Sequence, residues 1–270
     1  MGRLKTTWIR RFSGERANLG LRVAVTLIGA VLVALGIALS KHAGMGTAAV
    51  SSLPAVVTDI AQIAGQGWVT MGMCTFALNL LCLGAEAALL GREFHPVQLL
   101  QFPVFLMLSM AVDGWLWALS FVPADSYVLQ VAFLLLSIAT LGLGISLQLA
   151  PNLVMSPVDA IVQVFSYKTG RPYSSCKVAM DVALMTSAAA LSLGVLGGLY
   201  EVREGTIIAA LLVGRAVGLW SRALTRLAWV IPPAPRTFIA PLIPQGAATG
   251  ASEPAAAASL AAEGDLDLAE

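Results

Sequence analysis

Four charged residues stand inside long apolar stretches, where they could line the path of a substrate or an ion across a membrane. They are Asp113, Asp159, Asp181 and Arg215. An Asp or Arg at the centre of a membrane helix costs about 2.5–3.5 kcal/mol, so such side chains face a bundle interior or a water-filled cavity. The other interpretation is a structural ion pair that holds two helices together. Glu86 lies nearer the end of its apolar stretch, from which it could reach the membrane surface.

Of these residues, Arg215 most needs a carboxylate partner or a water-filled cavity, because its guanidinium group stays protonated under nearly all conditions. We expect Asp113 to be that partner, with Asp181 as the second choice. Asp159 follows Ser156-Pro157, a sequence typical of a helix start. It therefore either stabilises that helix terminus or stands where the same terminus could bind an anion.

No motif of a soluble enzyme accompanies these charges. The chain contains no GxSxG, no phosphate-binding GxxxxGK[ST] and no HExxH. Its cysteines, Cys74, Cys82 and Cys176, form no CxxC pair, and only two histidines are present. The sequence therefore predicts neither an enzyme nor a metal site nor a bound cofactor. The net charge of +1 argues against a basic nucleic-acid binder.

The composition is that of a membrane protein. Only 11% of the residues are charged, 58% are hydrophobic and the mean hydropathy is +0.83, whereas soluble domains carry about 25% charged residues. A membrane helix needs about 20 mostly apolar residues. We therefore predict an all-α polytopic fold in a lipid bilayer, with six spans at about 19–40, 67–90, 97–120, 127–149, 175–197 and 205–224.

Four segments remain outside the six spans. Two apolar segments, at about 45–62 and 153–166, are too short to span and are predicted to be re-entrant or interfacial. Residues 1–18 form a basic N-terminal segment. Residues 232–270, rich in Pro, Ala and Gly, are predicted to be a disordered cytoplasmic tail.

Two short matches indicate an internal repeat. Residues 35–40 (LGIALS) resemble 143–148 (LGISLQ) at an offset of 108, and residues 111–115 (AVDGW) resemble 216–220 (AVGLW) at an offset of 105. The matches superpose spans one to three, in residues 19–120, on spans four to six, in residues 127–224. Three spans per unit is an odd number, so the second unit is inverted, as in many secondary transporters.

The basic residues predict the orientation. With the N-terminus in the cytoplasm, thirteen of the sixteen Lys and Arg residues lie inside, Lys41 and Arg203 lie outside, and Arg215 lies within a span. Cytoplasmic loops carry this excess in membrane proteins. Both termini are therefore expected in the cytoplasm.

Two GxxxG pairs predict close helix packing. They are Gly194 with Gly198 and Gly214 with Gly218. Small residues at this spacing let helix backbones approach closely, either within one bundle or in a homodimer or a complex with another membrane protein.

The chain resembles the YczE/YyaS/YitT group of bacterial integral membrane proteins, chiefly its YczE-like branch. The resemblance rests on LGIA at 35–38, Gly44-x-Gly46, residues 99–113 and the string EGTIIAALLVG at 204–214. It covers about residues 11–225 and implies a multi-pass protein of the bacterial inner membrane. The family pattern favours Pro after the last glycine of that string, where this chain has Arg215.

Two functions fit this sequence. The first is a small-molecule transporter or permease of unknown substrate, supported by the repeat, the short segments and the charges within the spans. The alternative is a non-transporting membrane protein that assists or regulates a partner, in which the same charges are structural.

Overall fold

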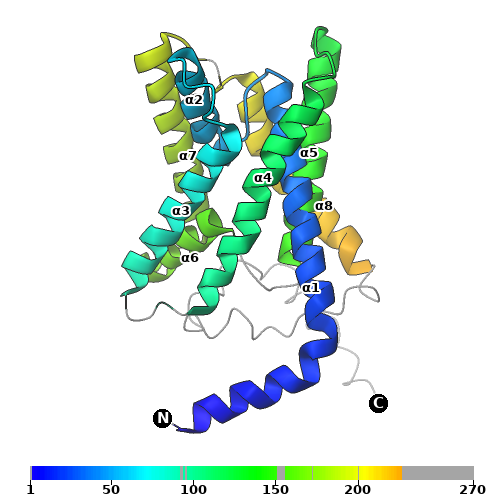
Figure 1. The fold of residues 1–270 in the computed structure, drawn as a ribbon, viewed down its shortest axis with the longest axis vertical. Coiled ribbons are helices and arrows are strands. Elements are labelled where there is room, and N and C mark those ends of the chain that lie inside the picture. The colour runs from blue at the N-terminus through cyan, green and yellow to red at the C-terminus, as the bar shows by residue number, and fades with distance from the viewer. Residues whose placement is uncertain are drawn as a thin grey trace, which may run out of the picture.

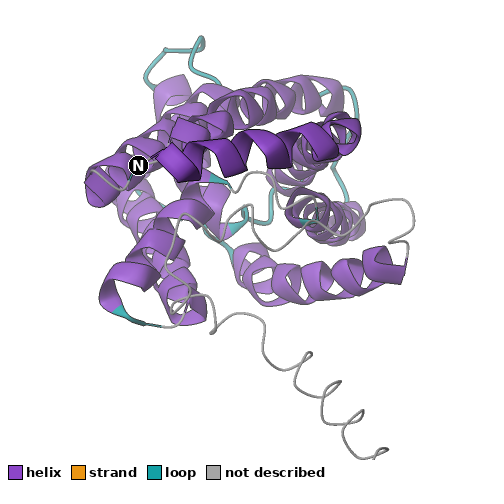
Figure 2. Cartoon of the chain, turned by 90° about the horizontal axis from the view of Figure 1, so that it is seen from below, coloured by secondary structure: helices purple, strands orange, loops and turns teal. Residues whose placement is uncertain are grey.

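The computed structural model is all-helical (Figure 1), and Figure 2 shows only helices and loops in the described chain. It describes residues 2–91, 94, 96–150, 156–171, 173–199 and 201–226, so the tail at 232–270 lies outside the described residues. The side chains of the N-terminal segment at 1–18 also lie outside them. The elements are α1 (Gly2–His42), α2 (Ala49–Ile63), α3 (Met71–Leu90), the 3-10 helix η2 (Pro96–Leu100), α4 (Gln101–Leu119), α5 (Tyr127–Leu149), α6 (Pro157–Thr169), α7 (Tyr173–Leu191), the π turn η3 (Ser192–Leu196) and α8 (Glu204–Arg226).

Six of the described helical segments are long and apolar enough to cross a membrane, which confirms the predicted spans. Their bounds are Arg22–His42, Met71–Leu90, Gln98–Leu119, Tyr127–Leu149, Ser175–Leu196 and Glu204–Leu224. The two remaining α-helices, α2 and α6, are shorter and correspond to the two segments predicted as too short to span. Ser156 occupies the N-cap position of α6 with Pro157 first in the helix, although the Ser156 side chain makes no capping hydrogen bond.

Glycines bring α1 and α5 together at the centre of the molecule. A Cβ added to Gly36 would lie 2.5 Å from Leu141 Cγ, and one added to Gly144 would lie 2.7 Å from the Val33 nitrogen. The offset of 108 converts Gly36 into Gly144 and Val33 into Leu141, so the second contact repeats the first with the two helices exchanged. Such reciprocity is the mark of a two-fold relation.

The outer helices of this group follow the same rule. Ala34 of α1 lies in one buried cluster with Ala111 of α4. The corresponding residues, Gly142 of α5 and Ala216 of α8, also meet: a Cβ on Gly142 would lie 2.7 Å from that of Ala216. Thus α4 packs on α1 as α8 packs on α5, at the predicted offsets of 108 and 105.

The short helices begin halfway along the longer helices that they contact. The first turns of α2 and α6 share a cluster with the middle of α3, at Cys82, and of α7, at Leu184. Its matched pairs are Val50 with Val158, Leu53 with Ile161, Leu78 with Met180 and Cys82 with Leu184. The last two pairs set the offset between α3 and α7 at 102. From this cluster α2 and α6 run towards opposite ends of the molecule (Figure 1).

The helices form two groups. The first contains α1, α4, α5 and α8, and the second contains α2, α3, α6 and α7, with α2 on α7 and α6 on α3. Between the groups, α3 packs on α4, but no packing of comparable extent joins α7 to α8 among the described residues.

Three of the four glycines predicted to mediate packing, Gly194, Gly214 and Gly218, do not do so in this arrangement. A Cβ on Gly194, Gly214 or Gly218 would meet nothing within 4 Å. The close approaches instead use Gly36, Gly142 and Gly144, because the α1–α5 pair forms the centre of the first group.

Candidate functional site

Asp159 and Asp181 lie together because both contact Lys177. Lys177 Nζ lies 2.9 Å from Asp159 Oδ1 and 3.2 Å from Asp181 Oδ1, and all three side chains are half-buried. Asp159 lies in the first turn of α6, while Lys177 and Asp181 lie one turn apart on α7. We call these three residues the α6–α7 triad. Two carboxylates and one ammonium group give it a formal charge of −1.

The triad lies near the point where the two short helices begin. Val158, which precedes Asp159, is 1% exposed and belongs to the cluster that contains Leu184. Asp181 lies within one turn of Leu184 on α7. The helices that converge at mid-span therefore place a charged group within about one turn of this cluster.

Sequence reasoning missed Lys177, although it counted this residue among the basic residues that set orientation. The available signal was its spacing, because Lys177 and Asp181 are four apart and side chains at that spacing meet on one helix face. The span Ser175–Leu196 also includes Lys177, so its ammonium group needed a partner.

Glu86 is buried and does not reach the surface. Its side chain accepts hydrogen bonds from Gln98 Nε2 at 2.8 Å and from Gln101 Nε2 at 3.2 Å, and the residue is 1% exposed. These bonds join α3 to η2 and the start of α4. The prediction that Glu86 extends to the membrane surface was wrong, because two amide groups satisfy its carboxyl group inside the bundle.

Asp113 secures the start of α3. Its carboxylate accepts a hydrogen bond from Thr70 Oγ1 at 2.6 Å and another from the Gly72 nitrogen at 2.7 Å. Thr70 in turn accepts a bond from the Met73 nitrogen at 3.1 Å. Asp113 and Thr70 therefore satisfy two of the amide groups that a helix N-terminus leaves unpaired.

The expected ion pair between Asp113 and Arg215 is not formed. Arg215 lies exposed on α8, and Asp113 bonds to the start of α3. The third and sixth spans, which correspond in the repeat, do not pack on each other in the described chain, because α4 packs on α1 while α8 packs on α5. The second choice is also wrong, since Asp181 pairs with Lys177.

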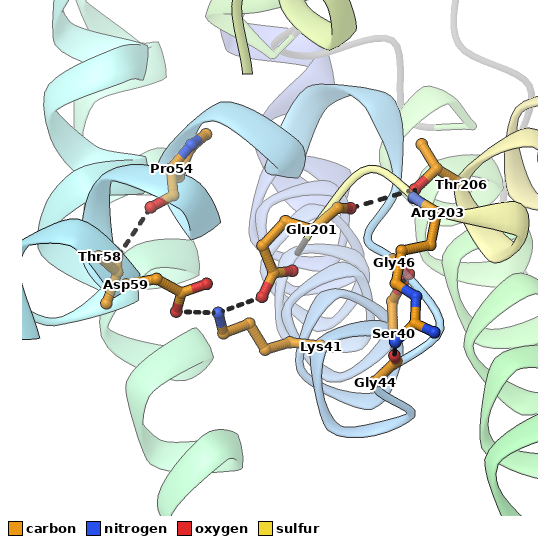
Figure 3. A network of polar contacts seen from close by, with 10 residues as sticks. All are labelled: Ser40, Lys41, Gly44, Gly46, Pro54, Thr58, Asp59, Glu201, Arg203 and Thr206. Atoms are coloured by element: carbon orange, nitrogen blue, oxygen red, sulfur yellow. Dashed lines mark hydrogen bonds and ion pairs between the residues drawn. The ribbon is translucent and has the colours of Figure 1, made fainter. Parts of the chain in front are cut away.

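A second charged network lies where α1 ends, and we call this end of the molecule the Lys41 end. Lys41 Nζ lies 2.6 Å from Asp59 Oδ1 and 2.7 Å from Glu201 Oε1 (Figure 3). It thereby joins α1 to α2 and to the segment before α8. Burial raises the pKa of Glu201 to about 7, and the attraction of Lys41 offsets this only in part.

Main-chain bonds reinforce the Lys41 end. The Thr47 nitrogen donates to the Glu201 carbonyl at 3.0 Å, and the Gly205 nitrogen donates to the Met45 carbonyl at 2.9 Å. Gly46 has φ +103°, and a Cβ there would lie 2.8 Å from the Arg203 nitrogen, so the loops fit closely only because this residue is glycine. Figure 3 shows the two loops side by side. The loop after α1 and the loop before α8 are thus bonded into one unit.

No group of three or more His, Cys, Asp or Glu side chains suited to a metal ion occurs among the described residues. Cys74, Cys82 and Cys176 are free thiols. The described spans carry carboxylates, the ammonium groups of Lys41 and Lys177, guanidinium groups, amides and hydroxyls.

Six apolar helices, two short helices starting at mid-span and charges held inside the bundle are the features of a multi-pass α-helical membrane protein. Residues 20–222 match the model of a family of unknown function, DUF6198, and the chain belongs to this family. No curated protein matches the chain, and no solved structure does.

Proposed function

We propose that the protein is a membrane transporter for a small molecule. The observation that carries this proposal is that the first turns of α2 and α6 meet at mid-span. Equivalent residues of the two repeats, such as Val50 and Val158, form this contact together. Secondary transporters built from inverted repeats bind their substrates and coupling ions near the bilayer midplane, beside interrupted helices. The corresponding place in this chain lies between the first turns of the two short helices.

The α6–α7 triad is the part of this place that could bind a charged group. The side chains of Asp159, Lys177 and Asp181 each remain about 30% exposed inside a span or a short helix. The formal charge of −1 favours a cationic substrate or coupling ion. Asp113 and Arg215, which we also expected on the path, lie outside this cluster.

The Lys41 end is the side at which we propose the path is closed. Lys41 and the loop bonds tie α1, α2 and the start of α8 together there. The distribution of Lys and Arg supports an orientation with this end outside the cell and both termini in the cytoplasm. A position in the bacterial inner membrane and kinship with the YczE-like branch belong to the same proposal, as does the absence of enzymatic activity.

Ligand-dependent stability tests this function. The full-length chain in lipid nanodiscs is unfolded by heat in the presence of organic cations, amino acids, organic anions and sugars, with and without Na⁺. A ligand of the folded state raises the apparent Tm. We expect a cationic or zwitterionic compound to do so, and Asp181→Asn to reduce the shift.

Asp125→Asn is the matched control, because Asp125 is an exposed residue in the loop between α4 and α5. It should keep the full ligand-dependent shift. A ligand whose shift survives in both Asp159→Asn and Asp181→Asn would place the binding site away from the triad. Uptake of that ligand into proteoliposomes then separates transport from binding alone.

One observation favours the alternative, a membrane protein that assists or regulates a partner. Arg215 lies in the middle of a span and exposes its side chain on α8. A charge facing lipid there is costly, and an acidic group on a partner's helix would relieve that cost. Loss of a co-purifying membrane protein on Arg215→Leu, without any ligand-dependent shift in the wild type, would support this function instead.

A further inference from the structure

The two halves of the molecule differ at one joint between helices. In the first half, α3 meets α4 through three aromatic rings: the centroid of Phe76 lies 5.8 Å from that of Phe102 and 5.3 Å from that of Phe105. In the second half, the corresponding helices α7 and α8 make no packing of comparable extent in the described chain. The other α-helix contacts within the first repeat have an equivalent in the second repeat, but the α3–α4 contact has none of comparable extent among the described residues.

The missing contact leaves apolar side chains uncovered. The offset of 102 between α3 and α7 carries Phe76 to Val178. The offset of 105 between α4 and α8 carries Phe102 to Ile207 and Phe105 to Ala210. Val178 is 62% exposed, Ile207 is 58% exposed and Ala210 is also exposed. Phe76, Phe102 and Phe105 pack together in the first half, whereas their equivalents Val178, Ile207 and Ala210 are exposed in the second half.

The surface of α8 at this joint is shaped for a close neighbour. The same offset converts Ser109 and Asp113, which contact α3 at Gly72, into Gly214 and Gly218. Nothing lies within 4 Å of a Cβ at either glycine, and α8 is the least buried of the six spans. We call Ile207, Ala210, Gly214 and Gly218 the open face of α8.

We propose that the protein adopts a second conformation, in which α7 packs on the open face of α8 and α3 separates from α4. This inference rests on the proposed transport function, since exchanging the two joints would move access to the mid-span site from one side of the membrane to the other. The second conformation is the first with the roles of the repeats exchanged, as inverted repeats permit.

We choose α7 as the helix that packs on the open face because a short link joins it to α8. The link between α7 and α8 is short, so α7 stays at a high effective concentration beside α8. This link contains Gly197 at φ +72°, next to the π turn η3. A glycine and a π turn in one link provide a place where the direction of α7 can change.

Cross-linking of paired cysteines tests the second conformation. Cys74, Cys82 and Cys176 are first replaced by alanine, and Val178→Cys is combined with Ala210→Cys in the full chain in nanodiscs. A short thiol-specific cross-linker should join the pair within one chain several-fold faster than it joins Val178→Cys with Ile208→Cys. Phe76→Cys with Phe105→Cys, at the joint packed in the present structure, serves as the positive control.

A glycine variant makes the test specific for the open face. Gly214→Leu should abolish the Val178–Ala210 cross-link, because the added side chain occupies the space that α7 needs. Gly114→Leu is the matched control, since a Cβ at Gly114 also meets nothing within 4 Å but the residue lies on α4 and is not part of the open face of α8. Both variants should fold as the parent does in size-exclusion chromatography, and spin-label distances between positions 178 and 210 should give two populations that Gly214→Leu reduces to one.

Three results would overturn the proposal. The first is a Val178–Ala210 rate equal to that of the Ile208 pair while the positive control reacts. The second is a cross-link only between two chains, which would assign the open face to a second copy. The third is a cross-link that Gly214→Leu leaves unchanged. None of these readouts needs a substrate, so they test the second conformation separately from transport. If the cross-links show the second conformation but no ligand binds and no uptake is found, transport is rejected and the second conformation stands.

Discussion

Glu201 is a carboxyl group at the Lys41 end that titrates near neutral pH. Burial raises its pKa from 4.5 to about 7, although Lys41 beside it favours the charged form. Between these two pH values the folded chain holds a proton that the unfolded chain has lost. The stability from this group is therefore full below pH 4.5 and is lost as the pH rises through about 7.

We expect the Tm of the wild type to fall more steeply between pH 4.5 and 7 than that of Glu201→Gln, which has no proton to lose. Thermal unfolding in detergent over this range measures the difference. Glu204→Gln is the control, because Glu204 is exposed and only weakly paired with Arg203 at 3.8 Å. Equal pH slopes for wild type and Glu201→Gln would show that Glu201 does not bind the proton.

Asp113 and Arg215 provide a second test at the scale of residues. Asp113→Ala removes two bonds at the start of α3 and should destabilise the protein by about 0.5–2 kcal/mol, the usual cost of a lost helix cap. Arg215→Ala should leave the stability unchanged or raise it, because Arg215 is exposed on α8 and a charge that faces lipid is costly. Since the two residues share no contact, the double variant should show the sum of the single effects within about 0.5 kcal/mol.

Reversible unfolding in mixed detergent micelles gives the four free energies of this cycle. A deviation from additivity well above about 0.5 kcal/mol would mean that the Asp113 and Arg215 side chains interact.

The sequence allowed individual charged residues to be found but not their partners. Asp159 and Asp181 stood out because a charge in an apolar stretch is rare. Their link through Lys177 depends on how α6 lies against α7, which no local pattern specifies. The error over Arg215 has the same origin, because equivalence in a repeat does not imply contact.

At the scale of elements, the α1–α5 contact should be sensitive to added volume. A Cβ on Gly144 would lie 2.7 Å from the Val33 nitrogen, an atom of the backbone that cannot rotate away. Gly144→Ala should therefore destabilise the protein by about 1–3 kcal/mol, as overpacking does. Gly114→Ala should be neutral or stabilising by up to about 1 kcal/mol, because alanine favours helix and the site is open.

Unfolding of the two alanine variants under the same conditions compares them directly. If Gly144→Ala were as stable as Gly114→Ala, the close approach of α1 and α5 would be wrong.

Length and hydropathy predicted the elements well, since six spans and two short segments follow from runs of apolar residues. Helix neighbours could not be predicted in the same way, because a face that meets lipid and a face that meets another helix are both apolar. The glycines show this directly. Gly214 and Gly218 have the spacing of a packing motif but meet nothing, whereas Gly36 and Gly144 lie in a close approach of two helices without a GxxxG pair between them.

At the scale of the whole molecule, the orientation can be measured. We expect the loop at Ser126 to be outside the cell and the turn at Thr169 to be in the cytoplasm. Single cysteines at these two exposed positions, in a background without native cysteines, are treated in intact cells with a thiol reagent that does not cross the membrane. Cysteine at 126 should react and cysteine at 169 should be protected; the reverse pattern would invert the topology.

The reciprocal contact between α1 and α5 also bears on how such a chain could arise. Gly36 meets Leu141 as Gly144 meets Val33. The two halves of the molecule therefore contact each other through equivalent surfaces. Two separate copies of a single half, inserted in opposite directions, would form the same contact twice, as any isologous dimer does. Joining them in one polypeptide fixes their ratio at one to one and leaves each half free to acquire its own charges. Lys41 in the first half and Lys177 in the second illustrate this difference, because their equivalent positions hold Leu149 and Thr75.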